Sequence, residues 1–228
     1  MLRSLVGSEM CIRDRIQTTL GFLLAFAVYY MTPKWQQFYK VALYIPVVLP
    51  ASVVAVMWKF MLNKDIGLVN TLLRLVGLDN LTHAWIGEKS TALGTVIAVN
   101  TWQYIGFTMV LFYIAMMNIS KDVLESAAVD GATKKDLFFN FFLPLTAGTT
   151  ETNVILSISG GMKSFALFYM LTGGGPGKAT TVVAQLIYTT AFVDFKFYRA
   201  LAMSTVLFII ILTLVLISRL IGRRYNYE

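Results

Sequence analysis

The chain has 228 residues, of which 57% are hydrophobic and 14% are charged. Soluble domains have about 45–50% apolar and about 25% charged residues, so the composition excludes an ordinary soluble domain and favours an integral membrane protein. The 19 basic and 12 acidic residues give a net charge of +7. The basic residues are scattered between apolar runs, which argues against nucleic-acid binding and fits the positive-inside bias of membrane proteins. A single cysteine, Cys11, excludes an internal disulfide framework.

The first 15 residues, MLRSLVGSEMCIRDR, differ in character from the rest of the chain. They carry several charges near their end, show no hydrophobic periodicity and lack the apolar core of a signal peptide. They resemble a translated sequencing-adapter artefact. We therefore expect residues 1–15 to be a non-native start and residues 16–224 to form the membrane domain.

Five membrane-spanning helices are expected in an all-α integral membrane fold. They cover residues 16–32, 39–61, 92–117, 146–171 and 200–220. Each run is mostly apolar and close to the roughly 20 residues that a helix needs to cross the hydrocarbon layer. The runs are continuous and do not alternate, which favours helices over strands.

The expected orientation follows from the basic residues after the last span, Arg219, Arg223 and Arg224. They predict a cytoplasmic C-terminus. Counting back, residues 118–145 lie inside, and residues 62–91 and 172–199 lie outside. The first span then begins outside, which predicts that a preceding helix is missing.

Two short helices are expected within the cytoplasmic loop, residues 118–145. Ser120 is expected to cap the first helix, and Gly131 to supply the left-handed residue that ends it. Thr133 and Asp136 have the spacing of a capping box for the second helix. That helix carries an apolar stripe at helical spacing: Leu137, Phe138, Phe141 and Phe142. The residues alone leave two interpretations open, an interfacial helix pair that only joins two spans and a contact element for another protein.

A longer pattern in the same loop begins with Glu125, Ser126 and Ala127. Gly131 follows after three residues, and Phe141-x-Leu143-Pro144 follows after nine more. This spacing resembles the EAA loop of ABC importer permeases, in which the pattern is E-A-A, three residues, G, nine residues, I-x-L-P. The resemblance implies that residues 120–144 form a coupling helix-turn-helix against a separate ATPase subunit. The coupling residues that it implies are Glu125, Ser126, Ala127, Asp130, Gly131, Ala132, Leu143 and Pro144.

A second pattern lies at residues 163–177, KSFALFYMLTGGGPG. Glycines and a proline end the helix at its outer end, and the outer-loop residues are Gly173, Gly174, Gly175 and Pro176. The stretch resembles the K-x-F-D-x-x-Y-x-L-T-x-G-G-P run of sugar-importing permeases of the maltose and glycerol-phosphate type, with Ala166 in place of the aspartate. The resemblance covers nearly all of residues 16–224 and corresponds to the last five of six family spans. It implies transport of a sugar, oligosaccharide or polyol-like solute.

The substrate pathway is expected to combine polar side chains with aromatic faces on which sugars stack. The candidate residues are Asn100, Gln103, Tyr104, Gly161, Lys163, Ser164, Phe165, Phe168 and Tyr169. For the polar members, the alternative interpretation is that they form hydrogen bonds between helices. For Lys163, the alternative is that its side chain extends to the outer surface of the membrane.

No catalytic or metal-binding set is evident in the sequence. His83 is alone, and neither a Ser–His–Asp set nor a Walker motif is present, so we expect no enzymatic activity, no bound cofactor and no metal. The resemblance implies that two partner ATPase subunits use ATP and Mg²⁺. It also implies a second homologous permease subunit and an extracytoplasmic solute-binding protein near residues 172–199. The expected location is the bacterial inner membrane. The alternative is an ion-gradient-driven secondary transporter, which needs paired acidic groups; Glu151 is the only acidic residue in an expected span.

Overall fold

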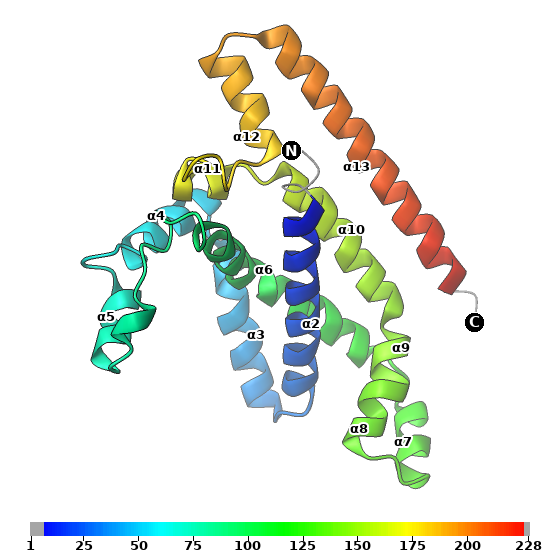
Figure 1. Cartoon of the computed structure of the whole chain (residues 1–228). Coiled ribbons are helices and arrows are strands. Elements are labelled where there is room, and N and C mark those ends of the chain that lie inside the picture. Colours follow the sequence, from blue (N-terminus) through cyan, green and yellow to red (C-terminus); the bar gives the residue numbers. More distant parts are fainter. Residues whose placement is uncertain (1–6, 226–228) are drawn as a thin grey trace.

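The computed structural model describes the backbone of residues 7–225, and the side chains of this part except for residues 7–11, 162–163 and 221–225. Helices and irregular connections make up this described part, and it has no strand, which confirms the all-α class (Figure 1). The side chains of Cys11 and Lys163 lie outside the described part.

Six helices are long. They are α2 (Gly7–Tyr29), α3 (Pro33–Val48), α4 (Ala51–Met61), α6 (Ala92–Met117), α10 (Ala147–Lys163) and α13 (Phe197–Tyr225). The shorter elements are α5 (Leu68–Leu75), η1 (Asp79–Leu81), α7 (Lys121–Val129), α8 (Lys134–Asp136), η2 (Leu137–Phe142), α9 (Leu143–Leu145), α11 (Ala166–Thr172), α12 (Val183–Tyr188) and η3 (Thr189–Val193). Both η2 and η3 are π-helical.

Helix α6 lies at the centre and packs along α2 and α3. Its sequence from Ala92 to Met117 carries no charge, and just over half of its apolar window is buried (56%). Two glycines allow the close packing: a Cβ at Gly106 would lie 1.9 Å from the Leu43 carbonyl oxygen, and a Cβ at Gly21 would lie 2.5 Å from Thr108 Cγ2. Small residues at such crossings let helix backbones approach closely.

This packing predicts that Gly106→Ala destabilises the fold. The new methyl group would meet the α3 backbone, and overpacking of this kind costs about 1–3 kcal/mol. At Gly94 on the same helix, a Cβ would have no heavy atom within 4 Å. The unfolding free energy in detergent should therefore fall for Gly106→Ala and stay unchanged or rise by up to about 1 kcal/mol for Gly94→Ala, because alanine favours a helix over glycine. Equal effects of the two substitutions would contradict the close contact.

The expected spans are only partly continuous. Within the part of the chain that the structure describes, two helices, Ala92–Met117 and Phe197–Leu220, are long and apolar enough to cross a membrane alone. The expected span at 39–61 is α3 and α4 with a bend of 97° between them, and the expected span at 146–171 is α10 and α11 with a bend of 53°. Counting each bent pair as one span gives up to four. Only residues 16–29 of the expected span at 16–32 are helical, because α2 begins at Gly7 and ends at Tyr29.

The bend between α3 and α4 has a local and a distant cause. Pro50 has no amide hydrogen and restricts Leu49 to extended backbone, where ψ is 134°. The Leu49 carbonyl oxygen then accepts a hydrogen bond from Nε2 of Gln103 on α6, at 3.1 Å. A side chain distant in sequence therefore satisfies the polar group that the bend exposes.

Candidate functional site

A cavity of about 680 Å³ lies between α2, α3, α4, α6, α10 and α11. This volume is in the range of small-molecule sites. Its polar lining residues are Arg13, Gln17, Asn100, Tyr104, Thr108, Asn153, Ser157 and Ser164. Aromatic rings of Tyr44, Phe107 and Phe165 form part of the remaining wall. The cavity thus combines hydrogen-bonding groups with flat apolar faces.

The structure brings some of the predicted pathway residues together at this cavity. Those that line it are Asn100, Tyr104, Gly161, Ser164 and Phe165. Gln103 instead holds the bend between α3 and α4, and Phe168 is buried in a hydrophobic cluster with residues of α4 and α6. Tyr169 is 38% exposed, and its ring stacks on that of Phe165 with centroids 5.0 Å apart. The role of this set in solute transport stays a prediction.

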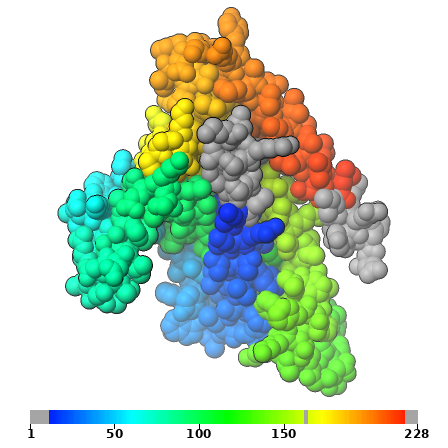
Figure 2. All heavy atoms as spheres, in the orientation of Figure 1, coloured from blue at the N-terminus to red at the C-terminus, as the bar shows by residue number. Residues whose placement is uncertain are grey.

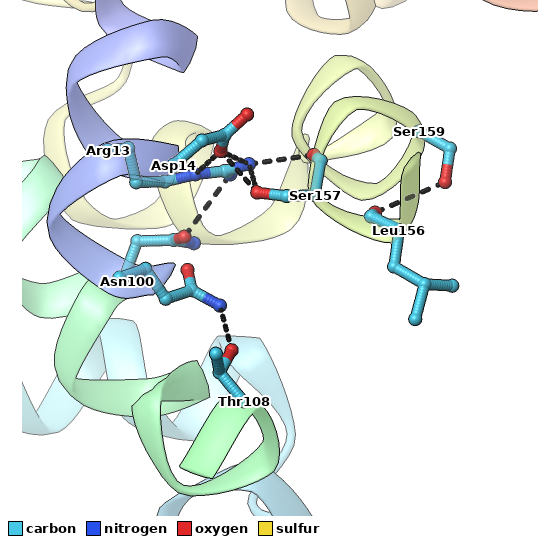
Figure 3. Close-up of polar contacts among 8 residues, drawn as sticks. Arg13, Asp14, Asn100, Thr108, Leu156, Ser157 and Ser159 are labelled. Atoms are coloured by element: carbon cyan, nitrogen blue, oxygen red, sulfur yellow. Dashed lines mark hydrogen bonds and ion pairs between the residues drawn. The ribbon is translucent and has the colours of Figure 1, made fainter. Parts of the chain in front are cut away.

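A hydrogen-bonded network crosses one side of the cavity (Figure 3). Nη2 of Arg13 donates to the Ser157 carbonyl oxygen at 2.7 Å and to Ser157 Oγ at 2.9 Å. Nη1 of Arg13 donates to Asn100 Oδ1 at 3.3 Å, and the guanidinium forms an ion pair with Asp14 at 2.8 Å. The close approach depends on Gly161, where a Cβ would lie 2.6 Å from Arg13 Nη2. Pairing and hydrogen bonds reduce the cost of burying these two charges.

Sequence reasoning missed Arg13 and Asp14, because both lie in the segment 1–15 that is expected to be foreign. In the structure α2 runs through residues 7–15 without a break. Arg13 precedes Gln17 by four residues, and Gly21 and Ala25 continue the same buried face. This i, i+4 continuation is the signal that could have found Arg13, and it gives no signal for Asp14. The expectation of a non-native start remains untested.

The turn at the end of α7 has the geometry that the sequence predicts. Gly131 has a φ of +82°, its amide donates to the Ala128 carbonyl oxygen at 3.1 Å, and the Ala132 amide donates to that of Ala127 at 2.9 Å. These two bonds form a Schellman motif. Ser120 does occupy the position before α7, but its side chain makes no capping hydrogen bond, so that predicted contact is wrong.

The predicted capping box at the start of α8 is confirmed. The Thr133 amide donates to Asp136 Oδ2 at 2.8 Å, and the Asp136 amide donates to Thr133 Oγ1 at 3.3 Å. The Thr133 hydroxyl also donates to Asp136 Oδ2 at 2.6 Å. These bonds favour the carboxylate, and the hydroxyl of Thr133 is the largest cause that lowers the pKa of Asp136.

The lowered pKa predicts how the capping box responds to acid. A carboxyl whose folded pKa is depressed adds stability above its unfolded pKa, and this stability is lost as the pH falls through the folded pKa. Thr133→Val removes the hydroxyl, so the pKa of Asp136 should rise toward its ordinary value. Carboxyl ¹³C titration of the labelled chain measures the change. Thr152→Val is the control, because the Thr152 hydroxyl donates to the Gly148 carbonyl oxygen and not to a carboxylate. An unchanged Asp136 titration in Thr133→Val would contradict the assigned cause.

The predicted coupling residues divide into an exposed tip and a packed base. Glu125, Ser126, Asp130 and Gly131 are exposed, as are Leu143 and Pro144, whereas Ala127 is buried and Ala132 is half-buried. Within the described part of the chain the tip is exposed, so its surface is available for contact with another protein. Figure 1 shows α7 and α8 projecting from the end of the molecule opposite the turn between α12 and α13.

The base of this loop packs against α2. Residues 137–142, which carry the apolar stripe, form a π-helix and not the expected regular α-helix. Their side chains are therefore distributed around the helix differently from the expected stripe. Phe142 is fully buried and Leu137, Phe138 and Phe141 are half-buried. The ring of Phe138 lies 5.2 Å from that of Phe22 and 4.9 Å from that of Phe26. A movement of the loop would therefore be transmitted to α2 through edge-to-face aromatic contacts.

The predicted glycine-rich outer loop ends α11 as expected. Gly173 has a φ of +64° and Gly174 a φ of +87°. A Cβ at Gly174 would lie 2.6 Å from Gln185 Nε2, which donates to the Gly173 carbonyl oxygen at 2.8 Å. The Thr180 hydroxyl lies 2.6 Å from that of Thr172 and donates to the Gly175 carbonyl oxygen at 2.8 Å. The loop carrying Gly175 and Pro176 is thus tied to α12.

The described residues contain no cluster of three or more His, Cys, Asp or Glu side chains that could hold a metal ion. His83 Nδ1 lies 3.2 Å from Glu88 Oε2 at a half-exposed position. The Ala84 amide, which donates to Glu88, is the main cause that lowers the pKa of that carboxyl. This pair is a loop contact.

The comparisons with known proteins agree on one family. Residues 17–227 match the family described as "Binding-protein-dependent transport system inner membrane component". The chain is 38% identical over 185 residues to the Bacillus subtilis protein named "Probable ABC transporter permease protein YurN", covering 81% of this chain and 63% of that protein. It is 31% identical over 188 residues to the diacetylchitobiose uptake system permease protein NgcF of Streptomyces coelicolor, covering 82% of this chain and 53% of that protein.

A solved structure shares the fold. It is the bacterial alginate ABC transporter in complex with an alginate pentasaccharide-bound periplasmic protein, with a TM-score of 0.85 and 21% identity, covering 98% of this chain and 79% of the matched chain. The present chain spans less than two thirds of the length of YurN and about half of that of NgcF. The family match covers most of the sequence. The chain therefore belongs to the family of inner membrane components of binding-protein-dependent transport systems.

Proposed function

We propose that this chain is a transmembrane permease subunit of an ATP-driven importer and passes a neutral sugar or polyol-like solute across the bacterial inner membrane by alternating access. The observation that carries the proposal is the cavity between α2, α6, α10 and α11, which joins amide and hydroxyl groups to the ring of Phe165. Within the described lining the only charged side chain is Arg13, and Asp14 pairs with it. Uncharged hydrogen-bonding groups beside an aromatic face suit a polyhydroxylated solute.

Two partner ATPase subunits would bind ATP and Mg²⁺ and contact the exposed tip around Gly131. This chain would hold no cofactor. The tip is joined to α2 through η2 and to α10 through α9, and both helices line the cavity. Closure of the ATPase pair would rock these helices as a rigid body and change the access to the cavity.

Two further partners complete the proposed importer. A second, homologous permease subunit would form the other half of the pathway, and a solute-binding protein would deliver solute near the loop that carries Gly173 to Pro176. The names of NgcF and of the alginate transporter complex support an oligosaccharide and a periplasmic protein as partners of this type. The C-terminus would then be cytoplasmic, because Arg219 ends the apolar run of α13 on the side of the coupling loop.

Uptake into vesicles tests the proposal. The full chain and the subunits encoded beside it are reconstituted, and uptake of radiolabelled diacetylchitobiose and other neutral oligosaccharides is compared with that of glycerol-3-phosphate. We expect uptake that requires ATP and persists when ionophores abolish the ion gradients. Uptake driven by an ion gradient without ATP would support the secondary-transporter alternative instead.

A further inference from the structure

A cluster of exposed aromatic side chains lies at the turn between α12 and α13, residues 192–199, which we call the 192–199 turn. Phe192 is 61% exposed, Phe195 74%, Phe197 50% and Tyr198 90%. Lys196 and Arg199 lie among them and are also exposed. Figures 1 and 2 show the turn at one extremity of the molecule, uncovered on the face that is seen. Large rings gathered in this way mark a surface that is covered in the working protein.

The backbone of the turn is closed by its own hydrogen bonds. The Asp194 amide donates to the Thr189 carbonyl oxygen at 2.9 Å, and the Lys196 amide donates to that of Thr190, also at 2.9 Å. Thr190 and Ala191 are buried beneath it. The rings are therefore presented on a defined scaffold, which is the arrangement expected of a contact surface.

The length of α13 determines where this turn lies. No charged residue occurs between Arg199 and Arg219, and the window over Phe197–Leu220 has a mean hydropathy of 2.9 with only 6% of it buried. At about 1.5 Å per residue the two arginines are roughly 30 Å apart, which is the thickness of the hydrocarbon layer. With Arg219 at one boundary, Arg199 lies at the other, and the 192–199 turn lies in the headgroup region.

The side chains of the turn match that region chemically. Aromatic rings concentrate at the membrane–water interface, and lysine and arginine near helix ends extend toward the lipid phosphates. A protein surface would match the rings equally well, but the placement of Lys196 and Arg199 at the end of an uncharged run, one hydrocarbon thickness from Arg219, favours lipid headgroups.

We propose that the 192–199 turn is a phospholipid anchor in the leaflet opposite the coupling loop. Lys196 and Arg199 bind lipid phosphates, and the rings of Phe195, Phe197 and Tyr198 lie at the level of the headgroups and the first chain carbons. The anchor depends on α13 crossing the membrane and not on the identity of the solute.

A series of ring contacts joins this anchor to the cavity. Phe197 lies 6.2 Å from Phe192, Phe192 lies 5.3 Å from Tyr188, and Tyr188 lies 4.9 Å from Phe165, which lines the cavity. The anchored turn therefore holds α12 and the cavity wall at a fixed depth in the bilayer. The coupling loop then moves other helices against a wall that the lipid surface positions.

Depth measurement by nitroxide labelling tests the location. The full chain with Cys11→Ser, assembled with its partner subunits in vesicles of phosphatidylethanolamine and phosphatidylglycerol, is labelled at Tyr198→Cys. Lys178→Cys, at an exposed outer-loop position, and Leu212→Cys, 48% exposed within α13, are the controls. The ratio of collisions with oxygen to collisions with a water-soluble nickel chelate should be lowest at 178, highest at 212, and severalfold above the 178 value at 198. A ratio at 198 equal to that at 178 would place the turn in water and overturn the proposal.

A second measurement tests the phosphate contacts. Replacing phosphatidylcholine by phosphatidylglycerol should broaden the spectrum of the label at 198, and the double substitution Lys196→Gln with Arg199→Gln should remove this effect. Lys64→Gln with Lys89→Gln is the matched control, because it removes two exposed cations elsewhere and should leave the effect intact. A spectrum that ignores the lipid charge, or one that broadens only when a solute-binding protein is added, would overturn the proposal. Neither measurement needs transport, so its failure is distinct from a failure of the proposed function.

Discussion

Gly131→Pro is expected to reduce ATP-driven uptake strongly while leaving insertion of the chain into the membrane unchanged. Gly131 has a φ of +82°, whereas proline is fixed near −65°. Proline also lacks the amide hydrogen that Gly131 donates to the Ala128 carbonyl oxygen at 3.1 Å. The Schellman turn would be lost, and the exposed tip would no longer keep its shape. Coupling free energies between sites are about 1–3 kcal/mol, so uptake should fall by about 5- to 150-fold.

The chain contains a matched control for this substitution. Gly77 has a φ of +77°, its amide donates to the Arg74 carbonyl oxygen at 3.0 Å, and no heavy atom lies within 4 Å of its Cβ position. Gly77→Pro therefore imposes the same local change at the end of α5, away from the coupling loop. Uptake and solute-stimulated ATP hydrolysis should stay at the parent level in Gly77→Pro and fall strongly in Gly131→Pro. Normal uptake by Gly131→Pro would show that the tip does not transmit the ATPase movement.

Charge reversal tests the same tip without altering its backbone. Glu125 is exposed on α7, so Glu125→Lys changes the surface offered to a partner and leaves the turn at Gly131 intact. We expect weaker co-purification of the ATPase subunits and a loss of uptake similar to that of Gly131→Pro. Glu125→Gln, which removes the charge without reversing it, should have a smaller effect. Co-purification that is insensitive to both substitutions would argue against this contact.

Local chemistry could be predicted from the sequence wherever neighbouring residues determine it. The bounds of α6 agree with the expected span at 92–117. A long uncharged run between polar flanks forms a helix in a membrane, because a helix satisfies its own backbone hydrogen bonds. The capping box of Thr133 and Asp136 and the left-handed Gly131 also follow from residues within one or two turns of each other.

Features that depend on distant contacts could not be predicted. Pro50 is visible in the sequence, but the hydrogen bond that the Leu49 carbonyl at the bend accepts comes from Gln103 of α6, a residue expected in the substrate pathway. Helices that are apolar all round have no periodicity to tell the cavity face from the packed face, so Phe168 is expected in the pathway although it is buried between helices. The π-helix at 137–142 likewise has no signal in an apolar run.

Substitutions in the cavity give the second large expected effect. Tyr104→Phe removes one hydroxyl from the lining and leaves the ring in place. A hydrogen bond contributes about 0.5–1.5 kcal/mol net, so the rate of neutral-oligosaccharide uptake at saturating binding protein should fall by about two- to twelvefold. Tyr39→Phe is the matched control, because Tyr39 is exposed to the same extent as Tyr104, at 37%, but does not line the cavity. Basal ATP hydrolysis should be unchanged in both variants.

Phe165→Leu removes the aromatic face at the same cavity. The ring is stacked on Tyr169 and lies 4.9 Å from Tyr188, so the remaining faces of these tyrosines stay in place when the phenyl group is replaced by an aliphatic side chain. Stacking contributes about 0.5–1.5 kcal/mol beyond area burial, so the uptake rate of Phe165→Leu should be about two- to twelvefold below that of the parent chain. Phe60→Leu, at a 69% exposed position outside the cavity, should leave uptake unchanged. If Tyr104→Phe and Phe165→Leu both transport at the parent rate, the solute does not depend on the hydroxyl and the aromatic face of this cavity, and the proposed solute site is wrong.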